Sequence, residues 1–191
     1  TCIGVVLGVL AGYYGGWVDS TIMRLCDVVL SFPTLIIIIT LASVLGPSIY
    51  NLMLAIGLLG WPPIARLLRG QMLSLRATEY VIAARAVGCG DRRLIFRHLL
   101  PNAMAPVLVA ATFGIAYAIL IEAGLSFLGL GVQPPTPSWG NMLTDAQSLT
   151  VLESMPWLWL PPGLMIALSV LSINFIGDGL RDALDPYLSN R

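Results

Sequence analysis

Long runs of apolar residues alternate with shorter polar segments along the whole chain. A helix that crosses a membrane needs about 20 mostly apolar residues, with a range of about 17–25. The pattern predicts five spans in 191 residues, at about 1–16, 28–45, 49–68, 102–125 and 157–176. The first run begins without Met and in the middle of apolar sequence, so we expect the tail of a spanning helix whose beginning is missing. The predicted fold class is all-α, a polytopic helical bundle of an integral membrane protein.

The segments between the predicted spans differ in character. Residues 17–27 carry three charged side chains and predict an interfacial turn, whereas Gly-Pro-Ser at 46–48 predicts a tight turn. Residues 69–101 are rich in Arg, and residues 126–156 are rich in Pro and contain no Arg. Inside the first span, small residues at a spacing of four predict a close helix–helix contact: Gly4, Gly8 and Gly12.

The distribution of basic residues predicts which side of the membrane each loop faces. All ten basic residues are Arg. Alternation of the five spans puts residues 17–27, 69–101 and 177–191 on one side, and every Arg lies on or beside that side. Because cytoplasmic loops carry an excess of basic residues, we expect residues 69–101 to be cytoplasmic and residues 126–156 to be external.

Composition narrows the classes of function. Hydrophobic residues make up 57% of the chain and charged residues 10%, whereas soluble domains average about 25% charged residues. A soluble domain and a disordered chain are therefore both excluded. The absence of Lys excludes a Walker A loop and a Schiff-base lysine. With one His and three separate Cys no zinc-ligand spacing occurs, so we expect no metal, no cofactor and no catalytic site.

Residues 69–101 predict two short helices joined by a glycine turn. Ser74 or Thr78 is expected to cap the first helix, and the glycines at 88 and 90 are expected to end it. The second helix is expected to begin with Asp91 as its N-cap and to stop at residue 100, before a proline restarts the next span.

Small residues of the first short helix predict a face bare enough to enter the groove of a partner protein: Ala83, Ala84, Ala86 and Gly88. The Arg residues around them leave a second interpretation open, an amphipathic helix lying on anionic lipid headgroups. The residues by themselves favour neither interpretation.

The spacing within this loop resembles a family motif. Ala83-Ala84 is followed by three residues, Gly88, twelve residues and Pro101. This pattern is similar to the EAA loop of binding-protein-dependent ABC transporter permeases, which implies a coupling helix that docks on the ATPase subunit. The implied coupling residues are Ala83, Ala84, Arg85, Gly88, Gly90 and Pro101. Ile82 stands where the family has Glu and His98 where it usually has Ile, so no role of that Glu is carried over.

Three further segments resemble the second permease of dipeptide, oligopeptide and nickel importers. They are GYYGGW at 12–17, LSFLGLG with QPPTP and WG within 125–140, and GDGLRDALDP at 177–186. The resemblance covers essentially the whole chain and implies the type I ABC importer permease fold. It also implies that an N-terminal helix and the segment after it are absent from this sequence.

The resemblance implies a permease subunit of an ATP-driven importer that translocates di- and oligopeptides by alternating access. The implied location is a bacterial or archaeal plasma membrane, which is the inner membrane if the cell is Gram-negative. Its implied partners are a second permease subunit, two ATPase subunits or domains, and an extracytoplasmic substrate-binding protein. A nickel-chelate or other small-solute importer stays open as an alternative. A secondary transporter, a membrane-embedded enzyme and a structural scaffold are the competing classes, and none has a supporting motif.

Polar residues in the spans and loops supply the remaining candidates. Glu122 and Asn174 are candidates for lining the pathway, since polar side chains inside spans are often functional; a structural hydrogen bond is the alternative for each. Pro135 and Trp139 are candidates for docking the binding protein. The charged tail is expected to be solvated or to contact the ATPase or the intracellular gate: Asp178, Arg181, Asp182 and Asp185.

Overall fold

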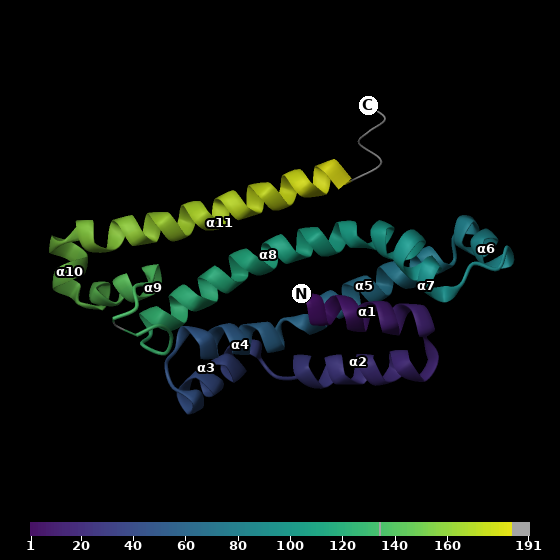
Figure 1. Ribbon diagram of the computed structural model, residues 1–191. Helices are drawn as coiled ribbons and strands as arrows, with labels where there is room; N and C mark the ends of the chain where they lie inside the picture. Colours follow the sequence, from purple (N-terminus) through teal and green to yellow (C-terminus); the bar gives the residue numbers. More distant parts are fainter. Residues whose placement is uncertain (134, 185–191) are drawn as a thin grey trace. The chain divides into compact units, whose positions relative to one another are not determined.

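The computed structural model describes residues 1–133 and 135–184, and within these ranges every regular element is a helix (Figure 1). The predicted all-α fold class is confirmed. In chain order the elements are α1 (Cys2–Tyr14), α2 (Gly16–Leu30), α3 (Thr34–Leu45), α4 (Ile49–Leu59), α5 (Trp61–Arg76), α6 (Glu79–Ala86), α7 (Asp91–Arg93), the π-helix η1 (Leu94–Leu99), α8 (Leu100–Phe127), α9 (Trp139–Met142), the 3-10 helix η2 (Thr144–Gln147), α10 (Leu149–Ser154) and α11 (Pro156–Leu184).

In the part of the chain that the structure describes, three helical stretches are long and apolar enough to cross a membrane: Ile49–Arg76, Asp91–Phe127 and Pro156–Leu184. Each contains one of the last three predicted spans. The helices α2 and α3 pass the same test together as a pair bent by 73°, which raises the number to four. The apolar helix α1 has 13 residues. The number of crossings and their direction stay predictions.

Residues 17–27 lie within the helix α2, so the prediction of a turn there is wrong. The chain reverses earlier, at Gly15, whose φ of 66° is readily available only to glycine. Two of the charged residues that suggested a turn form ion pairs with α5 instead: Asp19 with Arg69, and Asp27 with Arg66.

The segment predicted as one span at 28–45 is divided between two helices. α2 ends at Leu30 and α3 begins at Thr34, with Pro33 as its N-cap. Proline has no backbone N–H and disfavours the helical conformation of the residue before it, which accounts for the break.

The helix from Asp91 to Phe127 is continuous, so the predicted interruption at Pro101 is wrong. Pro101 is the second residue of α8, the helix that follows directly on the π-helix η1. The wider π turn leaves room for a proline ring that would clash in a regular α-helix. The N-cap is Gly90 rather than the predicted Asp91, which is the first residue of α7 and accepts a hydrogen bond from Tyr13 on its carboxylate.

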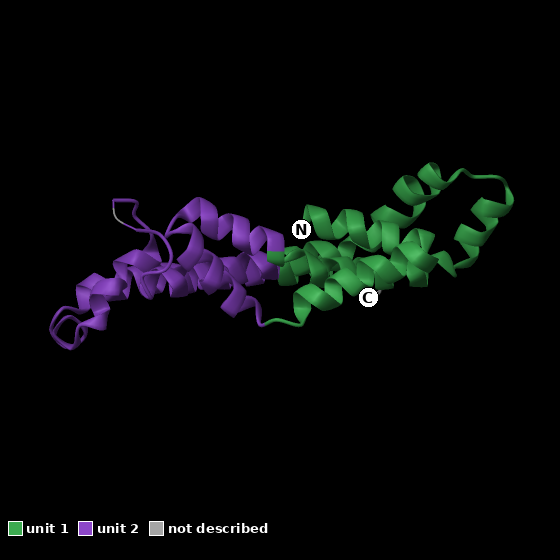
Figure 2. Ribbon diagram, turned by 90° about the horizontal axis from the view of Figure 1, so that it is seen from below, with its two compact units in different colours: residues 1–32, 59–111, 177–191 green, residues 33–58, 112–176 purple. Residues whose placement is uncertain are grey.

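The chain divides into two compact units, which Figure 2 shows in separate colours. Among the described residues, unit 1 comprises residues 1–32, 59–111 and 177–184, and unit 2 comprises 33–58 and 112–176. The long helices α8 and α11 contribute residues to both units.

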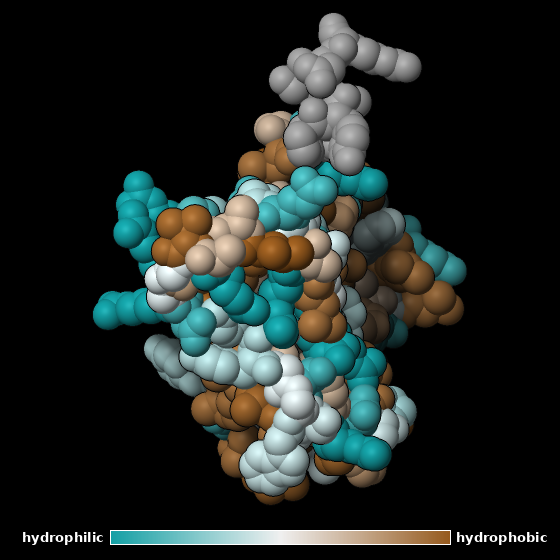
Figure 3. Space-filling model, turned by 90° about the vertical axis from the view of Figure 1, so that its right-hand side faces the viewer, coloured by the Kyte–Doolittle hydropathy of each residue, from teal (hydrophilic) through white to brown (hydrophobic). Residues whose placement is uncertain are grey.

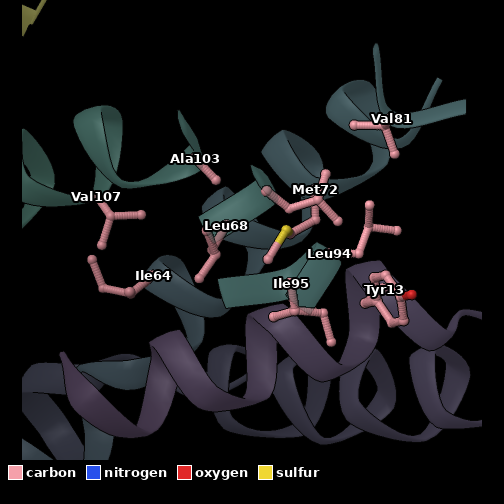
Figure 4. Close-up of a cluster of buried hydrophobic side chains, with 10 residues drawn as sticks. Tyr13, Ile64, Leu68, Met72, Val81, Leu94, Ile95, Ala103 and Val107 are labelled. Atoms are coloured by element: carbon pink, nitrogen blue, oxygen red, sulfur yellow. The ribbon is translucent and has the colours of Figure 1, made fainter. Parts of the chain in front are cut away.

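The core of unit 1 forms where α1 lies against α5. A Cβ added to Gly4, Gly8 or Gly12 would come within 2.6, 2.8 or 2.5 Å of an α5 atom, so the predicted close helix–helix contact is confirmed. Next to this contact, apolar side chains from α1, α5, α6, η1 and α8 converge on one cluster (Figure 4): Tyr13, Ile64, Leu68, Met72, Val81, Leu94, Ile95, Leu99, Ala103 and Val107.

In unit 2, the turn predicted at 46–48 separates α3 from α4. Gly46 has a φ of 85°, and the side-chain amide of Asn51 donates to the carbonyl oxygens of Leu45 and Gly46 at 2.9 and 3.1 Å. The amide therefore satisfies backbone carbonyls that the end of α3 leaves without a helical partner.

Candidate functional sites

The predicted docking helix is α6, and it is anchored on one side only. Val81 is buried in the core of unit 1, and Ala84 is half-buried against the same core. Ala83, Ala86 and Gly88 are exposed. The small face that is free for a partner is therefore narrower than the sequence suggested, because Ala84 contributes to anchoring the helix.

The helix α6 ends in a turn that favours glycine at one position. Gly88 has a φ of 84°, and its N–H donates to the carbonyl oxygen of Arg85 at 3.0 Å, while the N–H of Cys89 donates to that of Ala84 at 3.1 Å. Thr78 is the N-cap of α6, but its hydroxyl donates to the carbonyl oxygen of Leu75 and makes no capping bond. The turn thus fixes where the chain leaves α6.

A polar cluster joins this loop to the end of α1. The hydroxyl of Tyr13 donates to Oδ1 of Asp91, the first residue of α7. The guanidinium carbons of Arg76 and Arg85 lie 6.0 and 5.9 Å from the centroid of the Tyr13 ring, at cation–π distance. Nη1 of Arg76 also donates to the carbonyl oxygen of Gly12 at 3.0 Å. Side chains from α5, α6 and α7 therefore meet around one α1 ring that is only 4% exposed.

Basic and apolar side chains share the exposed surface next to this cluster. An open recess of about 680 Å³ is lined by Gly90, Asp91, Arg92, Arg93 and Phe96. Figure 3 shows the side of the molecule that carries α6, where hydrophilic side chains surround hydrophobic patches. Such a surface suits a protein partner and also the lipid headgroups of the alternative interpretation.

In unit 2, Glu122 is bonded to a serine one turn further along α8. The hydroxyl of Ser126 donates to Oε1 of Glu122 at 2.8 Å, and its oxygen accepts from the N–H of Val132 at 3.0 Å. Ser126 is only 1% exposed. The carboxylate thus orients a buried hydroxyl that binds the loop after α8.

That loop packs tightly onto the end of α8. A Cβ on Gly131 would lie 2.3 Å from Oγ of Ser126, and a Cβ on Gly140 would lie 2.6 Å from Cα of Ala123. Only glycine permits contacts this close. Trp139, which precedes Gly140, is thereby held beside the end of α8 within the same unit.

Trp139 and Pro135, the candidates for docking a binding protein, are both exposed. Trp139 is the first residue of α9, whose N-cap Ser138 accepts a hydrogen bond from the N–H of Asn141 at 3.1 Å. Trp139 therefore lies at a capped helix start, whereas Pro135 lies in the turn that precedes it.

The remaining candidates are the polar residues of α11. Asn174 is half-buried in α11, and among the described residues no hydrogen bond joins it to Glu122. Asp178, Arg181 and Asp182 are exposed at the end of α11. Asp185 lies outside the described residues, as do Pro134 and Pro186 of the sequence motifs. Within the described ranges, no three His, Cys, Asp or Glu side chains are grouped as a metal site.

Comparison with known proteins identifies the family. A profile described as "Binding-protein-dependent transport system inner membrane component" matches residues 4–190. The chain belongs to this family. It is 48% identical to the dipeptide transport system permease protein DppC of Alkalihalophilus pseudofirmus, over 98% of this chain and 61% of that protein. It is 46% identical to the di/tripeptide transport system permease protein DppC of Pseudomonas aeruginosa, again over 98% and 61%.

A third relative of this permease-family chain is the glutathione transport system permease protein GsiD of Pectobacterium atrosepticum, at 44% identity over 98% of this chain and 62% of that protein. The chain therefore spans less than two thirds of the length of these relatives. A solved structure of the MetNI methionine ABC transporter, in inward-facing conformations, matches with a TM-score of 0.74 at 19% identity. The match covers 96% of this chain and 87% of the MetNI chain. The match confirms the predicted permease fold.

Sequence reasoning about this permease missed two residues of the loop's attachment, Tyr13 and the carboxylate of Asp91. Tyr13 belongs to the GYYGGW motif at 12–17, and the sequence predicts Asp91 as a helix cap. Nothing in either local pattern indicates that the two side chains bond across 78 positions.

Proposed function

We propose that this chain is a permease subunit of an ATP-driven importer that translocates di- and oligopeptides across the plasma membrane by alternating access. Family membership supports a role in binding-protein-dependent transport. The names of the relatives support short peptides as cargo, because dipeptides, tripeptides and glutathione all share the peptide bond. The proposed partners are a second permease, two ATPase subunits or domains, and an external binding protein.

The exposed helix α6 carries the proposal. It is anchored by Val81, presents Ala83 to solvent and is followed by a turn at Gly88, whose φ is positive, as a short docking helix requires. ATP hydrolysis is assigned to partner subunits, since a chain without Lys has no Walker A loop. Closure of the ATPases would displace α6, and ATP can bias the transporter only if the closed ATPases fit one of its states better.

Two sides of the membrane are proposed for the two candidate surfaces. The Arg-rich loop at 69–101 is assigned to the cytoplasm and the loop at 126–156 to the outside, on the distribution of Arg. Exposed Pro135 and Trp139 are then available to a binding protein. The tight packing of this loop onto α8 supports such a role, because a docking surface must hold its shape.

The hydrogen bond to Ser126 supports a structural role for Glu122 over a role in lining the pathway. Asn174, half-buried in α11, has no such bond among the described residues and is the remaining candidate for the pathway.

Uptake in a strain that lacks this subunit tests the cargo. The strain receives the full-length gene and is offered labelled dipeptides, tripeptides, longer peptides and Ni²⁺ with and without a chelator. We expect the gene to restore peptide uptake that depends on an active partner ATPase. Restoration of Ni²⁺-chelate uptake alone would favour the nickel alternative, and uptake independent of the ATPase would favour a secondary transporter.

Copurification tests the docking helix. Ala83→Asp puts a charge where α6 is proposed to enter a groove, and burying an unpaired charge is costly. We expect the ATPase subunits to be lost from Ala83→Asp and retained by Ala83→Ser, with both variants reaching the membrane. Full retention in Ala83→Asp would favour the lipid-surface interpretation of the loop.

A further inference from the structure

We propose that Tyr13 and Asp91 are positioning residues for energy coupling. Their hydrogen bond is the joint through which displacement of residues 79–101 reaches the bundle of α1, α2 and α5. The inference rests on the proposed function, because it takes α6 to be the element that a partner ATPase moves. It adds to the proposed function the contact through which the movement of the loop is transmitted to the bundle.

The bundle on one side of this joint is tied together along its length. α1 meets α5 through three glycines that allow direct backbone approach. α2 is tied to α5 by ion pairs at two positions: Asp19 with Arg69 and Asp27 with Arg66. Since tightly packed backbones resist sliding and the half-buried Asp19–Arg69 pair holds α2 to α5, α1, α2 and α5 respond to a load as one body.

Apolar packing and a directional hydrogen bond both attach the loop on the other side to the bundle. Val81, Leu94 and Ile95 contribute apolar packing, which is not directional and tolerates small shifts. The bond from Tyr13 to Asp91 depends on both distance and angle, and its acceptor carries a charge. It therefore holds the start of the long helix Asp91–Phe127 in one position relative to α1.

The surroundings of Tyr13 connect the same ring to the docking helix. Arg85 belongs to α6 and Arg76 to the end of α5, and both guanidinium groups lie at cation–π distance from the ring. Arg76 also bonds to the backbone at Gly12, which fixes the end of α1. Displacement of α6 thus changes the contact between Arg85 and the Tyr13 ring. Displacement of α7 stretches or bends the hydrogen bond between the Tyr13 hydroxyl and Asp91, so both movements act on Tyr13.

Asp91 is available for this role because it does not cap its own helix. Gly90 is the N-cap in an extended conformation, and no side chain makes a capping bond there. A carboxylate in the first turn is favourable to the helix in any case, since it faces the positive end of the helix dipole. The hydrogen bond with Tyr13 is therefore additional to what helix formation requires.

The test uses the complete transporter in proteoliposomes: both permeases, the ATPases and the loaded binding protein. Tyr13→Phe removes the hydroxyl and keeps the ring with its Arg contacts. Tyr14→Phe is the matched control, because Tyr14 is the next residue and is exposed. We expect Tyr13→Phe to lower uptake and binding-protein-stimulated ATP hydrolysis about tenfold, as for loss of a hydrogen bond to a charged group. ATPase copurification and unstimulated hydrolysis should match those of Tyr14→Phe.

A double-mutant cycle with Asp91→Ala tests whether the two side chains act through one bond. We expect the double variant to be no worse than the more severe single variant, because residues that share one interaction are not additive. Additive losses, or normal stimulation in Tyr13→Phe, would overturn the inference. Loss of the ATPases from Tyr13→Phe would also overturn it, since the bond would then only shape the docking surface. Failure of the docking proposal itself gives a different result, retention of the ATPases by Ala83→Asp.

Discussion

Gly12 and Met72 lie so close together that a Cβ on Gly12 would come within 2.5 Å of the Cβ of Met72. One turn earlier in α1, a Cβ on Gly8 would lie 2.8 Å from the carbonyl oxygen of Ala65 and 2.9 Å from the Cβ of Leu68. The approach of α1 to α5 therefore depends on the absence of side chains from one face of α1.

Gly8→Ala should force these two helices apart. Overpacking a tight contact costs roughly 1–3 kcal/mol, and the nearest atom at Gly8 is backbone, which cannot rotate away. We expect a lower midpoint of thermal unfolding for the purified transporter. Gly70→Ala in α5 is the control, because no atom lies within 4 Å of its added Cβ and alanine is the better helix former. Equal midpoints for the two variants would contradict the close-contact account.

The ion pair between Asp19 and Arg69 should contribute more to stability than the pair between Asp27 and Arg66. Arg69 binds both carboxylate oxygens of Asp19, with Nη2 2.6 Å from Oδ2, and the Asp19 side chain is 17% exposed against 58% for Asp27. We expect Asp19→Asn to destabilise the protein by about 1–2 kcal/mol and Asp27→Asn by less than about 0.5 kcal/mol.

Chemical denaturation of the purified subunit measures both ion-pair variants. The double variant Asp19→Arg with Arg69→Asp reverses the two charges and should recover part of the stability that Asp19→Asn loses. Recovery should be only partial, because Asp19 also lies in the first turn of α2 and interacts favourably with the helix dipole. A larger loss of stability in Asp27→Asn than in Asp19→Asn would show that side-chain exposure does not determine which ion pair contributes more.

These two contacts illustrate what the sequence predicted and what it did not. The spacing of Gly4, Gly8 and Gly12 is a local periodicity, so the close contact of α1 could be predicted without its partner. The charges in 17–27 and the proline at 101 were interpreted locally as a turn and a helix break. The two Asp residues instead pair with Arg side chains of α5, which is far away in the sequence. The proline is accommodated in a continuous helix because a π turn precedes it.

In the candidate sites, too, the sequence predicted local features and missed contacts between distant segments. Gly88 was predicted as a turn residue because glycine alone indicates that role, and its φ of 84° agrees. The half-burial of Ala84, the bond from Ser126 to Glu122 and the bond from Tyr13 to Asp91 depend on how elements pack. Residue types and spacing in one segment do not encode such contacts.

Labelling of single cysteines should establish the topology. In a background without Cys2, Cys26 and Cys89, we expect Thr150→Cys to react with an impermeant thiol reagent in intact cells and Ser74→Cys to react only after lysis. Both side chains are exposed in the protein, so burial within the fold does not prevent labelling at either position. Equal labelling of the two from outside would contradict the orientation inferred from the Arg residues.

Glu122→Gln separates the structural role from the pathway role. The amide oxygen can still accept from Ser126, so a structural Glu122 predicts near-normal assembly and uptake. Ser126→Ala is the companion variant: it leaves the N–H of Val132 without its acceptor, at a cost of about 1–3 kcal/mol. We expect lower stability and weaker stimulation by the binding protein in Ser126→Ala. Lost uptake in Glu122→Gln, with assembly and basal ATP hydrolysis intact, would instead establish a pathway role.

Gly88 offers a test of the turn that follows the docking helix. Its φ of 84° lies in the left-handed region, and no atom beyond its two neighbours in the chain is within 4 Å of an added Cβ, so a substitution there acts through the local backbone. Gly88→Val should cost about 1–2 kcal/mol at that conformation and re-aim α6, because β-branched residues avoid positive φ.

Gly88→Asn is the matched control, since asparagine tolerates this region. We expect Gly88→Val to lose stimulated ATP hydrolysis and uptake while the subunit still reaches the membrane and pairs with its partner permease, and Gly88→Asn to keep both activities. Equal loss in the two variants would mean that the side chain, rather than the backbone conformation, disturbs the surface. Normal transport in Gly88→Val would show that the direction of α6 after this turn does not matter for coupling.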